Sequence, residues 1–429
     1  MGRILSITQN VTLPEKRMVW NQLLTLKNEG HEVVAICPEP AAMALDGSNA
    51  RSFERRDGID IFRYPQPLAS GSTASYLREY AAAFWHIRKL ARQLAGDRGF
   101  DVVQASNPPD FLLWAVYFLR RRGACLIFDH HDLVPELYLA KFGRGVLYWI
   151  TRLVEWVNFR VADIVLATNE SYRRTAMQRG GVRSDRVFVV RKGPNLANFQ
   201  LVPPDLTLRR GQRALIGFIG EIASQDGVDH AIRALAHLRE RRDDWHAIIA
   251  GDGGALAELR QLTTDLGLDD CVEFAGWVQD LELRRLVCSC DICLVPDPQT
   301  PLSDASSMLK VAEYMALARP IVAYDLTESR VTAGEAATYV TPNDPRAFAL
   351  AIDELLDDPE RRALMGRIGR ERVLRMFSWE QSSVELLRAY ELALDGRPGG
   401  RRRGRFLAGG QSSRDVHDDR PTAQAAAND

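Results

Sequence analysis

The feature that most constrains the fold is an alternation of short apolar runs with amphipathic segments, which occurs twice along the chain. Strands that alternate with helices in this way pair in parallel, so the pattern predicts doubly wound α/β structure. In the first half the strand-like runs are "GRILSIT", "HEVVAICP", "IDIFRYP", "DVVQAS", "CLIFDHH", "ADIVLATN" and "DRVFVVRKG". In the second half they are "ALIGFIGE", "HAIIAGD", "CVEFAG", "DICLVP" and "RPIVAYD".

A linker at 201–212, with Pro203, Pro204 and Gly211, separates the two halves. We therefore predict two facing Rossmann-like domains, at 1–200 and 213–378, with a cleft between the carboxyl ends of their sheets. The tail 396–429 is poor in apolar residues and rich in Gly, Arg and Ser, so it is predicted to be disordered. A contact of its arginines (Arg401, Arg402, Arg403 and Arg405) with anionic lipid is the alternative.

Composition indicates a soluble protein: 46% of the 429 residues are apolar and 26% are charged. We find neither a long uncharged apolar run nor a signal-peptide pattern, which predicts a cytoplasmic location. The six cysteines lie in or beside apolar runs, as reduced core residues do. The cluster "CSCDIC" lacks the second ligand pair that a zinc site needs, so no metal ion is expected.

Charge is distributed unevenly along the chain. Residues 1–200 hold 27 basic and 19 acidic side chains, whereas residues 201–395 hold 21 and 33. A basic half could meet nucleic acid, an anionic membrane surface or an anionic substrate. The sequence has no nucleic-acid-binding motif, so nucleic acid is not predicted as a partner.

Polar and glycine-rich segments follow several predicted strands. "FIGEIASQDGVDHAIRAL", with Gly220, could aim backbone N–H groups at an anion, or it could be a plain turn. "LIFDHHDLVPELY" places His130, His131 and Asp132 at a strand end, as a general base, as ligands for sugar hydroxyls or as satisfied loop residues. Arg191 in "VVRKG", with the lysine after it, suits a diphosphate or forms a solvated basic turn.

The segment "DASSMLKVAEYMALARPIVAYD" predicts a polar loop, a short helix and a buried strand. Ser306, Ser307 and the N–H groups of the following first turn form a predicted anion site, to which Lys310 adds a full charge. Glu313 lies three residues after Lys310, on the same side of the helix, and offers an acceptor for a diol. These parts suit a nucleoside diphosphate; a capped helix with an exposed Lys and Glu is the alternative.

Two segments of the first half are amphipathic, aromatic and basic. They read "REYAAAFWHIRKLARQLAGDRG" and "GVLYWITRLVEWVNFRVAD". Helices that pack on the core of the first domain are one interpretation, and an interfacial helix that draws the protein to a membrane is the other.

In these motifs the chain, up to about residue 395, resembles the retaining glycosyltransferases of the group 1 or family 4 type, which have the GT-B fold. More narrowly it is similar to the bacterial branch that assembles polysaccharides. The motifs that carry the resemblance are "SNPPD", "FDHHDLVPELY", "ATNESYRR", "RVFVVRKGPNLANF", "QDGVD", residues 294–344 and "FSWE".

The resemblance implies a nucleotide diphosphate sugar as donor, bound by the acidic second domain, and no cofactor or metal. It implies a saccharide acceptor, often lipid-linked, on the basic first domain, and a final helix at 379–395 that crosses back to that domain. The catalytic residues it implies are His131, Lys310 and Glu313. The donor-binding residues it implies are Gly220, Arg191, Asp304, Ser306, Ser307, Met308, Lys310 and Glu313, and those on the acceptor side are Asn107, His130 and Asp132.

The sequence departs from the family pattern in two places. Ala305 stands where the first glutamate of the family's E-x₇-E motif is expected, with Asp304 one residue away. Glu221 and Asp226 stand near the places of the usual Arg and Lys after "FIG". The alternative functions are a nucleotide-sugar 2-epimerase, which shares the two-domain fold, and a catalytically silent glycosyltransferase-like partner subunit.

Overall fold

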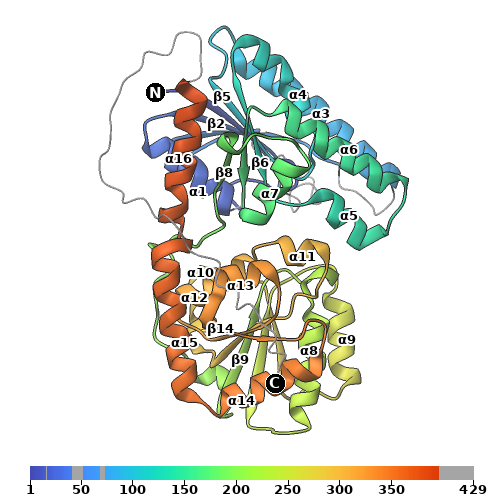
Figure 1. Ribbon diagram of the computed structural model, residues 1–429, viewed down its shortest axis with the longest axis vertical. Coiled ribbons are helices and arrows are strands. Elements are labelled where there is room, and N and C mark those ends of the chain that lie inside the picture. Colours follow the sequence, from blue (N-terminus) through green and yellow to red (C-terminus); the bar gives the residue numbers. More distant parts are fainter. Residues whose placement is uncertain (16, 41–51, 68–72, 396–429) are drawn as a thin grey trace, which may run out of the picture.

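The computed structural model describes residues 1–15, 17–40, 52–67 and 73–395. The predictions made for the tail 396–429, disorder and a lipid contact, lie outside the described residues. Two α/β lobes lie one above the other, with the first half of the chain in one and most of the second half in the other (Figure 1). Among the described helices, none combines the length and the apolar character needed to cross a bilayer.

The first lobe contains an eight-stranded sheet of order β3-β4-β2-β1-β5-β6-β7-β8. Its strands pair in parallel, except that the edge strand β3 runs antiparallel to β4. The order β4-β2-β1-β5-β6-β7 is the 3-2-1-4-5-6 order of a Rossmann fold. The strands are β1 Arg3–Ile7, β2 Glu32–Pro38, β3 Phe53–Arg56, β4 Ile59–Tyr64, β5 Val102–Ser106, β6 Cys125–His130, β7 Ile164–Ala167 and β8 Val187–Val189.

The second lobe contains a six-stranded sheet of order β11-β10-β9-β12-β13-β14, parallel throughout. This is again the Rossmann order, and it reverses between β9 and β12. The two-domain prediction is thus confirmed. The strands are β9 Ala214–Ile219, β10 Trp245–Ala250, β11 Val272–Gly276, β12 Ile292–Val295, β13 Ile321–Tyr324 and β14 Ala337–Val340.

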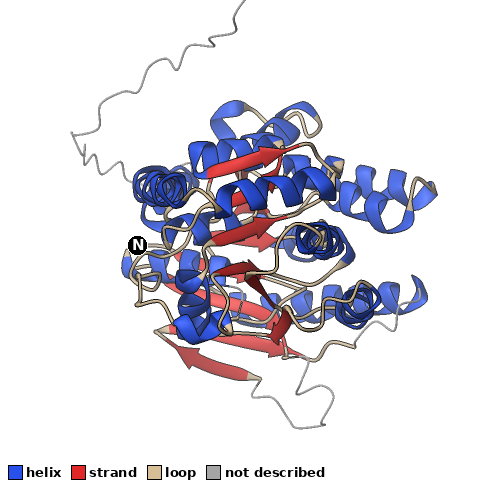
Figure 2. Cartoon of the chain, turned by 90° about the horizontal axis from the view of Figure 1, so that it is seen from below, coloured by secondary structure: helices blue, strands red, loops and turns tan. Residues whose placement is uncertain are grey.

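Helices cover both faces of the sheets (Figure 2), so the central strands are apolar and buried along most of their length. The edge strands β3 and β14 are more exposed. In the first lobe the helices are α1 Arg17–Asn28, α3 Thr73–Ala95, α4 Leu112–Val116, α5 Val134–Phe142, α6 Val146–Val161 and α7 Glu170–Gln178. In the second they are α8 Val228–Arg239, α9 Leu256–Asp265, α10 Asp280–Ser289, α11 Pro301–Ala305, α12 Leu309–Ala316, α13 Thr327–Ala333, α14 Pro345–Leu356 and α15 Pro359–Arg372.

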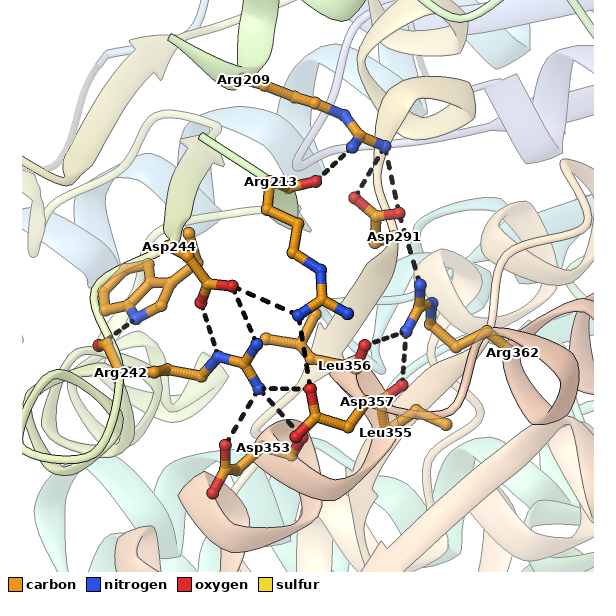
Figure 3. A network of polar contacts seen from close by, with 11 residues as sticks. Arg209, Arg213, Arg242, Asp244, Asp291, Asp353, Leu355, Leu356, Asp357 and Arg362 are labelled. Carbon is orange, nitrogen blue, oxygen red and sulfur yellow. Dashed lines mark hydrogen bonds and ion pairs between the residues drawn. The ribbon is translucent and has the colours of Figure 1, made fainter. Parts of the chain in front are cut away.

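A network of ion pairs joins the amino ends of the second sheet's strands to α14 (Figure 3). Arg242 lies 2.7 Å from Asp244 and 3.1 Å from both Asp353 and Asp357. Asp291, which precedes β12, lies 2.9 Å from Arg209 and 3.9 Å from Arg362. Because ligands of open α/β sheets bind at the carboxyl ends of the strands, we assign this network to stability rather than to chemistry.

The last described helix, α16 Trp379–Asp395, crosses from the second lobe to the first and packs against α1, β5, β7 and β8 (Figure 1). The indole N–H of Trp379 donates to the hydroxyl of Thr25 across 3.1 Å. The hydroxyl of Tyr390 donates to the side-chain carbonyl of Gln104 across 2.5 Å. The last described helix therefore completes the core of the first lobe.

This packing predicts that Trp379→Ala destabilises the first lobe. Trp379 is 5% exposed, and removing a buried aromatic side chain of this kind costs about 3–5 kcal/mol. Urea unfolding followed by circular dichroism measures the loss. The control is Val384→Ala, which lies on the same helix at 47% exposure and should cost less than about 0.5 kcal/mol. Equal losses for the two variants would contradict the packing role of α16.

Candidate active site

A cavity of about 570 Å³ lies between the lobes, where the carboxyl ends of the two sheets meet. The second lobe lines it with the turns after β9 and β10 and with the start of α12. The first lobe contributes the start of α1, the turn after β6 and the segment after β8. Of the predicted site residues, the cavity brings together His131, Asp132, Gly220, Ser307, Met308, Lys310 and Glu313.

The two glycine turns of the second lobe pack against each other. Gly251 has a φ of +157°, and a Cβ there would lie 1.9 Å from the carbonyl oxygen of Gly220. The N–H of Gly220 itself donates to the carbonyl of Ala250 across 3.1 Å. The glycine at position 251 therefore allows the two turns to approach closely, and the N–H of Gly220 is already engaged, which favours the plain-turn interpretation.

The loop between α11 and α12 is held by residues of the first lobe. The side-chain amide of Asn169 donates to the carbonyl of Ala305 across 2.8 Å and to the hydroxyl of Ser307 across 3.0 Å. The hydroxyls of Ser306 and Tyr172 lie 3.1 Å apart. Both predicted serines thus contact the other lobe, and Met308, the residue before the first turn of α12, follows them in the cavity wall.

Lys310 is held in place by a buried carboxylate that the sequence did not single out. Its ammonium nitrogen lies 3.0 and 2.9 Å from the two carboxylate oxygens of Asp297, a residue with 0% exposure just beyond β12. The same nitrogen lies 4.8 Å from the centre of the Phe218 ring. Part of the lysine charge is therefore balanced before any ligand arrives. The position of this aspartate in "LVPD", directly after a buried strand, was the feature of the sequence that could have identified it.

Glu313 presents a carboxylate to the cavity from the first turns of α12. It is 7% exposed, and this burial raises its pKa to about 7, although the charge of Arg17 acts in the opposite direction. The guanidinium of Arg17 lies 4.0 Å from Glu313 and 2.6 Å from Asp280. Arg17 is at the start of α1, so this cation links the two lobes across the cavity.

His131 is oriented by a chain of buried polar side chains. Its Nε2 lies 2.6 Å from Asp129, and the same Asp129 oxygen accepts from Gln104 across 2.9 Å and from Ser106 across 2.8 Å. Gln104 in turn accepts from Tyr390 on α16. A chain of hydrogen bonds thus connects helix α16 to the cavity histidine. Sequence spacing does not reveal this arrangement.

Two of the three predicted acceptor-side residues lie away from the cavity. His130 is fully buried against Phe128 and Phe159, and burial lowers its pKa to about 3, so the ring is neutral. Asn107 is also buried, and its carbonyl oxygen accepts from the N–H of His131 across 2.6 Å. Asp132 is the member of this set that lines the cavity. His130 does not line the cavity because successive residues at a strand end point to opposite sides.

Arg191 and Asp304 do not line the cavity either. Arg191 stacks on Phe377, 5.2 Å from the ring centre, and lines a different hollow, whereas Lys192 lines the cavity and donates to the carbonyl of His131 across 3.2 Å. Asp304 caps the start of α13 instead, where it accepts from the N–H and hydroxyl of Thr327 across 2.8 and 3.0 Å. A carboxylate is stabilised at a helix start by the unpaired N–H groups there.

Two facing Rossmann-like lobes with a cavity between their strand ends make up the GT-B architecture. The profile "Glycosyltransferase Family 4" matches residues 16–198, and "Glycosyl transferases group 1" matches residues 213–358. The chain belongs to this group 1 and family 4 type of glycosyltransferases.

Relatives and solved structures agree with this assignment. An MMP alpha-(1->4)-mannosyltransferase of Mycolicibacterium hassiacum is 26% identical over 85% of this chain and 91% of its own length. Sucrose-phosphate synthase of Thermosynechococcus elongatus has the same fold, with a TM-score of 0.73, 19% identity and coverage of 92% of this chain and all of that one. The HepE protein of Anabaena, solved with UDP-glucose, has a TM-score of 0.69 at 17% identity, covering 91% of this chain and all of that one.

The buried pair of Lys310 and Asp297 predicts a strong coupling between the two side chains. Asp297→Ala leaves the ammonium group buried without its carboxylate, which costs about 3–5 kcal/mol of stability. The double variant with Lys310→Met should recover most of this loss, because no unpaired charge remains. Thermal unfolding of both variants measures the coupling.

A surface pair serves as the control for this coupling. Asp270→Ala removes the partner of Arg239, 2.9 Å away, where the two side chains are 62% and 35% exposed. An exposed pair of this kind contributes less than about 1 kcal/mol. If Asp297→Ala were as mild as Asp270→Ala, the buried pair would not hold Lys310.

Proposed function

We propose that this glycosyltransferase moves a sugar from a nucleotide diphosphate sugar to a hydroxyl of a lipid-linked saccharide, in cell-surface polysaccharide biosynthesis at the cytoplasmic side of the membrane. The observation that carries the proposal is one interdomain cavity that holds two lysines and a buried carboxylate, Lys192, Lys310 and Glu313. Positive groups suit a diphosphate, and a carboxylate suits the two hydroxyls of a ribose. The solved complex of HepE with UDP-glucose supports the donor class.

In this proposal the diphosphate lies at the start of α12. Lys310 projects from the first turn of that helix, whose unpaired N–H groups favour an anion. Lys192 adds a second cation from the first lobe, in the place that the sequence had suggested for Arg191. Glu313, one turn further along α12, accepts from the ribose, and Asp132 and the surrounding first-lobe wall receive the acceptor.

The proposed reaction retains the configuration at the anomeric carbon. The bond from that carbon to the diphosphate oxygen breaks, a bond to the acceptor oxygen forms on the same face, and the acceptor's proton passes to the departing phosphate. The two lysines and the helix start stabilise the charge that develops on the diphosphate, which makes a metal ion unnecessary. His131, fixed by Asp129, orients the sugar, and closure of the lobes over the cavity limits hydrolysis by water.

Transfer assays test the proposal directly. The purified protein is incubated with membrane extract and a panel of radiolabelled nucleotide sugars, and the anomeric configuration of the product is read by NMR. We expect one donor to label a lipid-soluble product with its configuration retained. An inverted product would overturn the retaining mechanism, and a 2-epimer released without acceptor would favour an epimerase. No transfer and no hydrolysis with any donor would favour a silent subunit.

The raised pKa of Glu313 predicts pH-dependent donor binding. The ionised carboxylate is the better acceptor for ribose hydroxyls, and it becomes protonated as the pH falls through about 7. The affinity should therefore be about tenfold weaker at pH 6 than at pH 8, following the ionised fraction. Calorimetric titration with UDP, GDP and ADP measures the effect, using the nucleotide that binds most tightly.

Glu313→Gln is the matched control. It keeps the size of the side chain and removes its titration, so its binding should be weaker at pH 8 and should change less with pH. Subtracting the two profiles removes the titration of the ligand's own phosphate. Identical pH profiles for the two proteins would contradict the assignment of Glu313 to the ribose.

A further inference from the structure

Helix α6 lies on one flank of the first lobe (Figure 1), and it carries an exposed apolar stripe. Val146 is 77% exposed, and Trp149 and Leu153 are each 58% exposed. Their spacing of three, four and seven residues places them on one side of the helix. We define the α6 face as Phe142, at the end of α5, together with Val146, Leu147, Trp149, Ile150, Leu153 and Trp156.

The inner side of α6 is more polar than this outer face. Of its four buried residues, Glu155 and Asn158 are polar, and both are 1% exposed. Glu155 lies 3.1 Å from Arg179, which also pairs with Glu136 on α5. A surface helix of a soluble domain normally has the opposite arrangement, with its apolar side inward. Packing within the lobe therefore does not account for the exposed aromatic and aliphatic side chains.

The exposed charges at the two ends of the α6 face are positive. Arg144 and Arg160 are exposed at its two ends, and the guanidinium of Arg160 lies 4.5 Å from the ring centre of Trp156. The acidic side chain between residues 142 and 161 is Glu155, which is buried and paired. Two copies of this face would bring like charges together, whereas an anionic lipid surface complements both the arginines and the tryptophans.

The α6 face also lies a short distance from the cavity. Asp132 lines the cavity, α5 begins two residues later at Val134, and this nine-residue helix ends at Phe142 on the α6 face. At 1.5 Å per residue, α5 spans about 13 Å. A surface in contact with the α6 face would thus lie within reach of the acceptor side of the cavity.

We propose that the α6 face docks on a bilayer that contains anionic lipid, with its apolar side chains in the headgroup region and its arginines beside lipid phosphates. This contact places the cavity next to the membrane surface, where an acceptor anchored in lipid can enter from the first lobe. It extends the proposed function by naming the surface that meets the acceptor's membrane. The docking proposal is tested by vesicle binding, whereas the proposed function is tested by sugar transfer. A failure of one can therefore be distinguished from a failure of the other.

Vesicle co-sedimentation of the full chain tests this proposal. The vesicles contain phosphatidylcholine alone, or phosphatidylcholine with about one third phosphatidylglycerol, at low and high salt. We expect the protein to sediment with the anionic vesicles and to be partly released by salt. Leu147→Gln combined with Leu153→Gln should weaken this binding about tenfold or more, because it removes apolar area from the bilayer contact. Arg144→Gln and Arg160→Gln should each weaken binding to the anionic vesicles about fivefold and leave binding to phosphatidylcholine vesicles unchanged.

Leu350→Gln combined with Leu364→Gln is the matched control. These leucines of the second lobe are 44% and 49% exposed, close to the 42% and 58% of Leu147 and Leu153. The control should bind vesicles like the wild type. Wild-type protein that binds neither vesicle, or an α6-face variant that binds as well as the control, would overturn the proposal. Light scattering could also show that the wild type forms a dimer and that the α6-face variant is a monomer. If that wild-type protein did not bind vesicles, the proposal would be overturned as well.

Discussion

The hydrogen bonds that Asn169 donates to the loop between α11 and α12 set how the two halves of the site face each other. Ser171, two residues later, donates across 2.6 Å to Glu328 on α13, which also accepts from Ser307. The start of α12, which lines the cavity, follows directly after this loop, so the first lobe helps to hold its backbone in place. Both lobes therefore build the cavity, and neither forms it alone.

The fold could be predicted from sequence because strands buried on both faces are continuously apolar and are separated by amphipathic segments. Every strand-like run of the first half became a strand, and the run of parallel pairings followed the usual Rossmann order. The edge strand β3, Phe53–Arg56, was missed because "FERR" has three charged residues and little apolar character. Its pairing with β4 comes from the neighbouring strand and not from its own composition.

The site could be predicted as a set of segments but less well as a set of side chains. Sequence identifies strand ends and helix starts, which gave His131, Lys310 and Glu313. It does not say which of two neighbours points into the cavity, so sequence named Arg191 and Lys192 together, and Lys192 is the one that lines the cavity. Partners from distant segments, such as Asp297, depend on tertiary packing. The same limit applied to α6, whose periodicity defined an apolar side without showing that this side faces outward.

The bond between Tyr390 and Gln104 joins positions 286 residues apart, and it has a consequence for the order in which the enzyme is assembled. The first lobe emerges from the ribosome long before α16 is synthesised, and domains tend to fold as they emerge. The side chains that fix the cavity histidine remain incompletely supported until the last helix docks. An interrupted translation product that lacks α16 would therefore leave the cavity histidine without part of its support.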